Sequence, residues 1–88
     1  MLVEVKKSFL KQLAGLPKDI RSRIEDFVFE ELPKFESIGQ SGKIEKMHGY
    51  KFCYKIRFGN YRVGLVFQDD VVTVKVVMHR SEIYRFSP

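Results

Sequence analysis

The dipeptide Gly59-Asn60 constrains the fold of this 88-residue chain more than any other feature of its sequence. It is flanked by two segments, 52–58 and 61–67, in which apolar side chains occupy every second position. A glycine–asparagine pair between two alternating segments is typical of a two-residue β-hairpin loop. The two segments are therefore predicted to be antiparallel strands, with Phe58 opposite Tyr61.

A second turn extends this hairpin into a three-stranded meander. Asp69-Asp70 predicts the turn, and the valine-rich segment 71–78 predicts the third strand. Side chains along a strand point to alternate faces of a sheet, so the register gives one continuous apolar face. That face is expected to form the core, and it holds Tyr54, Ile56, Phe58, Tyr61, Val63, Leu65, Phe67, Val72, Val74, Val76 and Met78.

The sequence before the sheet predicts a short strand followed by helices. Residues 2–5 are compatible with a strand, and apolar residues then recur at helical spacing between Ser8, which should cap the first helix, and Pro33, which should end the second. The expected fold class is α+β: a short N-terminal strand, a helical hairpin, an antiparallel three-stranded meander and a short C-terminal segment. We expect residues 1–88 to form one domain.

The net charge of +5 lies in the strand-rich half of the chain. Residues 1–42 carry seven Lys or Arg and seven Asp or Glu, whereas residues 43–88 carry nine and four. Such an uneven distribution favours a polyanion such as RNA, or an acidic protein, as partner.

The predicted register gathers several of these positive charges on the face opposite the core. Arg57 should stand directly opposite Arg62 with no acidic neighbour, an arrangement that costs about 0.2–1 kcal/mol. Gly64 beside them leaves room for a ligand to approach the backbone. A phosphate-binding face explains this pattern, and an ordinary solvated sheet face is the alternative. We call the following set the cationic face: Lys55, Arg57, Arg62, Lys75 and, beside Arg62, His79.

Three motifs identify a family resemblance. They are Lys46-Met47-His48-Gly49, then Tyr54-Lys55-Ile56-Arg57-Phe58-Gly59-Asn60-Tyr61-Arg62-Val63, and the C-terminal segment 76–85, which contains H-R-x-x-x-Y. With the short strand and helical hairpin before them, they make the chain resemble the RelE/ParE toxin superfamily over essentially its whole length. The resemblance implies the toxin of a type II toxin–antitoxin system. It implies a cytoplasmic protein that binds the ribosome, cleaves mRNA without a metal or other cofactor, and is neutralised by a cognate antitoxin, with a toxin–antitoxin heterotetramer as an expected assembly.

The resemblance also assigns roles to particular residues. Lys55 and Arg57 match the basic strand pair, and Arg62 matches the hairpin arginine that grips phosphate. Arg80 matches the C-terminal catalytic arginine, and Tyr84 the tyrosine that stacks on a base. The chain departs from the family where Arg57 replaces a frequent second lysine and where it ends soon after Tyr84. RNA contacts are expected from Lys55, Arg57, Arg62, Lys75, Lys46 and Lys51.

This set of residues suits cleavage of RNA through its own 2′-hydroxyl group. Lys55 suits the base, because neighbouring like charges favour the neutral form of an amine. Arg57 and Arg62 would hold the phosphate. Either Arg80 or His79 would protonate the leaving oxygen.

Other interpretations of the reactive residues are weaker. Cys53 and His79 share a face, but their positions place them roughly 20 Å apart, which excludes a dyad and favours a packing cysteine. His48 and Asp69-Asp70 are expected in turns, and no cluster of His, Cys, Asp or Glu has the spacing of a metal site. Tyr84 has a second interpretation as an aromatic that caps the core.

Two competing functions remain from the sequence. One is a ParE-like poison of DNA gyrase on the same fold, and the other is a non-catalytic RNA- or protein-binding module. The chain has no run of eighteen apolar residues and no signal-peptide pattern at its charged start, and it has one cysteine. These features favour a cytoplasmic protein with no membrane partner.

Overall fold

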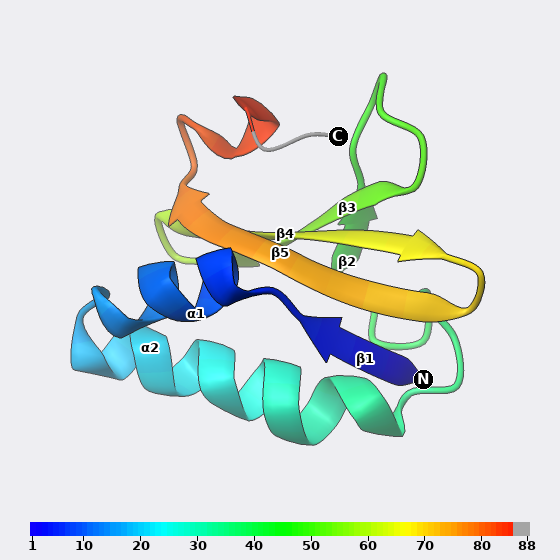
Figure 1. Cartoon of the computed structure of the whole chain (residues 1–88), viewed down its shortest axis with the longest axis horizontal. Helices are drawn as coiled ribbons and strands as arrows, with labels where there is room; N and C mark the ends of the chain where they lie inside the picture. The colour runs from blue at the N-terminus through cyan, green and yellow to red at the C-terminus, as the bar shows by residue number, and fades with distance from the viewer. Residues whose placement is uncertain (86–88) are drawn as a thin grey trace.

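The computed structural model describes residues 1–85, except for the side chain of Tyr84. A layer of helices covers one face of a single five-stranded sheet (Figure 1). The elements in chain order are β1 (Leu2–Val5), α1 (Lys7–Ala14), α2 (Lys18–Glu25), the π-helical η1 (Asp26–Glu31), the 3-10 helix η2 (Leu32–Lys34), β2 (Ile44–Lys46), β3 (Cys53–Phe58), β4 (Tyr61–Gln68), β5 (Val71–His79) and the 3-10 helix η3 (Ile83–Arg85). The predicted α+β class is confirmed.

The sheet is larger than the predicted meander. Its strand order is β1-β5-β4-β3-β2, so the three predicted strands lie in the centre and a short strand flanks them on each side. β1 pairs with β5 in parallel, whereas all other pairs are antiparallel. The sheet is therefore mixed: the helices lead the chain from β1 at one edge to β2 at the other, and the antiparallel strands β2 to β5 then bring it back beside β1.

Two tight turns set the register of the central strands, as predicted. Gly59 has a φ of +58°, and the hairpin around it pairs Arg57 with Arg62 and Phe58 with Tyr61. Asp69 and Asp70 have φ values of +55° and +63°, the geometry of a type I′ turn. Both predicted hairpins are confirmed.

The predicted register fails in the second half of β5, where a β-bulge shifts it by one residue. Leu65 pairs with Val74 as predicted, but Gly64 pairs with Val76 and leaves Lys75 as the extra residue. A one-residue shift exchanges the faces of every side chain beyond it. Val77 is therefore buried in the core, at 2% exposure, in place of Val76 and Met78, which the sequence had placed there.

Helix α1 supports β5 beyond the end of β1. The Ser8 Oγ atom donates a hydrogen bond to the Lys75 carbonyl at 2.7 Å, and the Gln12 Oε1 atom accepts one from the Val77 N–H at 3.0 Å. The predicted role of Ser8 as a helix cap is wrong, because the helix begins at Lys7 and the Ser8 side chain binds β5 instead.

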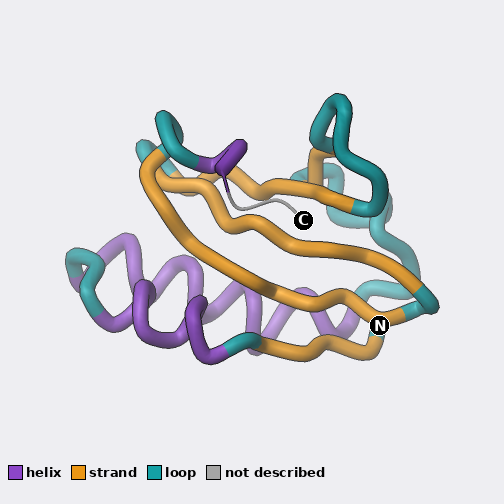
Figure 2. Tube along the Cα trace, turned by 45° about the horizontal axis from the view of Figure 1, so that its top comes forward, coloured by secondary structure: helices purple, strands orange, loops and turns teal. Residues whose placement is uncertain are grey.

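The main core lies between the helices and the sheet. Figure 2 shows the helices along the lower face of the strands, where their apolar sides meet the sheet. The edge of the Phe27 ring meets Phe58, with 5.9 Å between the ring centroids. The fully buried members are large and apolar, as the periodicity predicted, and include Phe9, Ile24, Phe27, Leu32, Ile56, Val63, Leu65, Val72 and Val74.

A second apolar cluster covers part of the other face of the sheet. Its buried members are Met47, Cys53 and Ile83, at 1%, 0% and 2% exposure. Val66, Val76, Met78 and Tyr50 pack against them. The loop before β3 and the segment after β5 are thus attached to the face that the sequence analysis left uncovered.

Candidate nucleic-acid interface

The face opposite the helices is divided into an apolar part and a charged part. Alternation along β3 puts Lys55 and Arg57 on the same face as Cys53, and Arg62 lies opposite Arg57. The second apolar cluster covers the Cys53 end of this face and, through Val76 and Met78, its β5 side. The cations are therefore gathered at the other end, next to the Gly59-Asn60 turn.

A carboxylate that the sequence analysis missed lies among these cations. Glu45 in β2 pairs with Lys55, and its Oε1 atom accepts a hydrogen bond from Arg57 Nε at 2.9 Å. The expectation that the opposed arginines have no acidic neighbour is therefore wrong. The side chains of Arg57 and Glu45 are 63% and 42% exposed, and an ion pair this exposed contributes about 0–1 kcal/mol. A phosphate can therefore displace the carboxylate from Arg57 at little cost.

Arg62 is held by its own hairpin. Its Nη1 atom donates to the carbonyl oxygens of Gly59 and Tyr61, at 2.7 and 2.9 Å. The same turn receives the C-terminal segment, because the Arg80 N–H donates to the Asn60 carbonyl at 2.8 Å. The turn thus brings the guanidinium of Arg62 and the backbone of Arg80 together, although they are far apart in sequence.

Of the predicted members of the cationic face, Lys75 loses its predicted pairing and His79 lies on the other side of the sheet. The bulge takes Lys75 out of the register, so it does not face Gly64, and Arg62 faces Met78 and not Val77. His79 pairs with Tyr61, and the edge of one ring meets the other at 6.1 Å between centroids. Because Tyr61 packs against the main core, His79 lies on the helix side of the sheet and not beside Arg62.

The remaining predicted site residues lie outside the charged part. Lys46 pairs with Tyr54, which packs against the main core, so the register does not put it on the face of Lys55. Lys46 is exposed in β2, with its Nζ atom 5.2 Å from the centroid of the Tyr54 ring, and Lys51 is exposed in the loop before β3. Arg80 is exposed directly after β5. Tyr84 belongs to η3, but its side chain lies outside the described residues, so neither of its predicted roles is tested.

The other reactive residues have structural roles. Cys53 is buried and pairs with Val66 of β4, whereas His79 pairs with Tyr61, five residues away along β4. The two reactive side chains are therefore about 16 Å apart, too far for a dyad. Within the described part of the chain, no group of three or more His, Cys, Asp or Glu side chains could hold a metal ion. No helix among the described residues is long and apolar enough to span a membrane.

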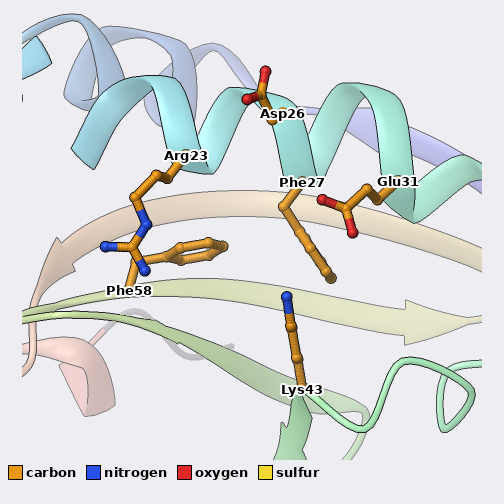
Figure 3. A pocket seen from close by; sticks show the side chains of 6 residues that line it. All are labelled: Arg23, Asp26, Phe27, Glu31, Lys43 and Phe58. Carbon is orange, nitrogen blue, oxygen red and sulfur yellow. The ribbon is translucent and has the colours of Figure 1, made fainter. Parts of the chain in front are cut away.

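A pocket of about 200 Å³ opens on the helix side of the sheet, away from the cationic face (Figure 3). Phe27 and Phe58 form its apolar wall, and Lys43 points toward the Phe27 ring at 5.3 Å from its centroid. Two cations and two carboxylates line it, so it lacks the positive excess that a phosphate needs. Its lining residues are Arg23, Asp26, Phe27, Glu31, Lys43 and Phe58.

Another pocket lies at the cationic face itself. It has a volume of about 230 Å³ and is lined by Gly42, Lys43, Glu45 and Arg57. Sequence reasoning missed this feature because β2 has only three residues, too few for a strand pattern. The only sign of a strand here in the sequence was a single apolar residue, Ile44, between the charged residues Lys43 and Glu45.

Comparisons with known proteins agree on one family. A family model described as "ParE toxin of type II toxin-antitoxin system, parDE" matches residues 3–84. Toxin RelE3 of Methanocaldococcus jannaschii is 37% identical over 89 residues, which cover 100% of both chains.

Solved structures give the same result for the fold. The toxin–antitoxin complex RelB–RelE from Methanococcus jannaschii contains a chain that matches with a TM-score of 0.77 and 35% identity, over 97% of this chain and 99% of that one. The intact RelBE complex of E. coli matches with a TM-score of 0.62 and 26% identity, over 89% of this chain and 94% of that one. The predicted strand–hairpin–sheet architecture is therefore shared with these toxins.

Proposed function

Because this chain belongs to the RelE/ParE superfamily of type II toxins, we propose that it is a ribosome-dependent endoribonuclease that cleaves mRNA and thereby stops translation. The observation that supports this most is the hairpin register. It puts Lys55, Arg57 and Arg62 on one face, and the turn of the same hairpin holds the segment that carries Arg80. A cognate antitoxin is the proposed protein partner, since the related RelE chains occur in complexes with RelB.

The chemistry follows from elementary requirements of RNA cleavage. The 2′-hydroxyl attacks the adjacent phosphorus, a P–O bond forms, and the bond to the 5′-oxygen breaks. Lys55 would accept the hydroxyl proton, while Arg57 and Arg62 stabilise the negative charge on the phosphoryl oxygens. Arg80 would assist the departure of the 5′-oxygen, and Tyr84 would stack on a base. His79 is a poorer candidate for the acid than it was from sequence, because it lies on the helix side of the sheet.

The proposal predicts a cut that depends on the 2′-hydroxyl. Purified toxin added to ribosomes programmed with a defined mRNA should give discrete ends in primer extension. Replacing the nucleotide 5′ to the cut by its 2′-deoxy form should abolish that cut, because it removes the attacking group. A cut that persists at the deoxy position would contradict the mechanism, and a complete lack of cuts with the wild-type chain would contradict the function.

Poisoning of DNA gyrase is the alternative, and the ParE name of the matching family model favours testing it. Gyrase poisoning predicts loss of supercoiling activity and double-strand breaks in DNA, with mRNA left intact. The mRNA endoribonuclease predicts the reverse. One supercoiling assay beside the ribosome assay separates them.

The Glu45–Arg57 pair gives a prediction about RNA binding. Glu45→Ala should tighten binding to a single-stranded RNA at low salt and steepen the slope of log K against log salt by about 0.7. This slope change is the value for one added phosphate contact, which Arg57 can make once its carboxylate partner is removed. The measurement is a salt titration followed by fluorescence anisotropy.

Glu30→Ala is the matched control for this prediction. Glu30 is an exposed glutamate in η1, on the helical layer, so its removal changes the net charge by the same amount. It should leave the salt slope unchanged. Equal slopes for the two variants would show that only net charge matters and that Arg57 does not gain a contact.

A further inference from the structure

The loop between β2 and β3 holds an exposed aromatic ring on a strained backbone. Phe52 is 44% exposed, and its φ is +64°, in the left-handed region that bulky residues rarely adopt. Its carbonyl accepts a hydrogen bond from the Phe67 N–H at 2.9 Å, which ties this conformation to the end of the sheet. Strain of this kind is concentrated at functional sites, and here burial of the ring does not offset it.

The surroundings of this ring are uniformly cationic. The stretch 46–68 contains five Lys or Arg residues and no Asp or Glu. His48 and Lys51 belong to the loop itself, Lys46 is the last residue of β2 beside it, and all three are exposed. The Lys46 ammonium donates to the Tyr50 carbonyl at 3.1 Å, so the loop is also attached to β2.

The position of the loop relates it to the cationic face. It projects from the side of the sheet away from the helices, as does the C-terminal segment (Figures 1 and 2). Met47 and Cys53, at its two ends, are buried in the second apolar cluster with Ile83. Phe52 precedes Lys55 by three residues, which span at most about 10 Å of chain, so one RNA strand can contact both.

We propose that Phe52, together with Lys46, His48 and Lys51, forms a stacking platform for an unpaired base of the RNA strand whose phosphate is bound at the cationic face. The inference rests on the proposed function and adds to it a second contact with the same strand. Aromatic rings stack on any base, and nearby cations contact the adjoining phosphates. A cavity of about 310 Å³ lined by loop residues 46–51 provides room beside the backbone.

A nucleic acid fits this surface better than a protein does. The exposed large apolar side chains among the described residues are Leu2, Leu10, Phe29 and Phe52, and of these Phe52 alone lies in the cationic stretch. The buried core of a protein interface is a group of apolar side chains with few charges. A single ring among cations has the opposite composition.

The test compares two phenylalanines with the same exposure. Phe29 in η1 is 43% exposed and is followed by Glu30 and Glu31. The full-length toxin is titrated into a short fluorescein-labelled single-stranded RNA whose nucleotides are 2′-O-methylated to prevent cleavage. Phe52→Ala should weaken binding about 5- to 150-fold, the usual effect of losing one base–aromatic stack, and Phe52→Trp should retain it. Phe29→Ala should change binding less than about twofold.

A second arm separates stacking from loss of structure. Phe52→Gly accepts the positive φ, so it should keep the thermal stability of the wild type and still lose the affinity. Moving a single abasic site along the RNA should find a position at which wild type and Phe52→Ala bind equally, because the stacked base is gone.

Three results would overturn the inference. In the first, Phe52→Ala and Phe29→Ala bind the RNA equally well. In the second, Phe52→Ala binds more weakly than the wild type by the same factor wherever the abasic site is placed. In the third, Phe52→Ala loses antitoxin binding while its RNA binding stays intact. The last result would assign the ring to a protein contact. If wild-type toxin still cuts mRNA on ribosomes while Phe52→Ala binds RNA normally, only this inference fails and the proposed function stands.

Discussion

Arg62→Ala should lower the rate of mRNA cleavage on programmed ribosomes about 100- to 1,000-fold, the usual cost of removing one preorganised donor to a developing negative charge. Arg62 lies opposite Arg57 on the cationic face and is fixed at the hairpin turn by two carbonyl oxygens. Both of these bonds use Nη1, and a guanidinium has five donor hydrogens, so phosphate contact does not require their release. Arg62→Lys should recover only part of the rate, because an ammonium lacks the planar fork.

The control for this variant removes a positive charge elsewhere. Arg23 is exposed on α2, on the helix side of the sheet, and Arg23→Ala should cleave at close to the wild-type rate. Both variants should melt within a few degrees of the wild type, since neither side chain is buried. Single-turnover cleavage measured by primer extension gives the rates. Wild-type cleavage by Arg62→Ala would remove the hairpin arginine from the mechanism.

Ile83→Ala should reduce cleavage about 100-fold without touching a charged residue. Ile83 is buried at 2% exposure against Met47 and Cys53, and this contact attaches the segment with Arg80 and Tyr84 to the sheet. Truncating a buried isoleucine costs about 2–5 kcal/mol of local packing. Misplacement of catalytic groups by about 1 Å is enough for a loss of this size.

Hydrogen exchange distinguishes a released segment from a destabilised fold. The Glu82 and Arg85 amides donate to His79 and Glu82 carbonyls at 2.9 Å, and in Ile83→Ala both should exchange much faster than in the wild type. Amides of the central strands should keep most of their protection.

Ile24→Ala, in the main core, is the matched truncation. It should lower the melting temperature of the whole protein yet cleave normally at temperatures where it is folded. If the two isoleucine variants lost activity in parallel with their stability, Ile83 would have no special role.

The parts of the fold that follow from local signals were predictable. Gly59-Asn60 and Asp69-Asp70 are turn sequences whose geometry fixes the register near them, and β3, β4 and the first half of β5 pair as the sequence predicts. The helical hairpin follows from its apolar period in the same way.

The parts that failed depend on contacts distant in sequence. Val76 and Val77 are equally suited to the core, so only the bulge at Lys75, supported by Ser8 and Gln12 of α1, decides which is buried. Glu45 entered the site because a three-residue strand pairs with β3. The predicted set Lys55, Arg57 and Arg62 does share a face, whereas the bulge takes His79 to the other face and removes the predicted pairing of Lys75 with Gly64.

The parallel pairing of β1 with β5 limits how early the sheet can form during translation. β5 lies between β1 and β4, yet of the five strands of this sheet it is the last to be synthesised. Until residues 71–79 leave the exit tunnel, β1 has no neighbour and the helices have an incomplete sheet to cover. Non-local pairing of this kind also slows folding. The face that carries Lys55, Arg57 and Arg62 is therefore completed late, when β5 gives β4 its second neighbour and the segment after β5 binds the hairpin turn through the Arg80 N–H.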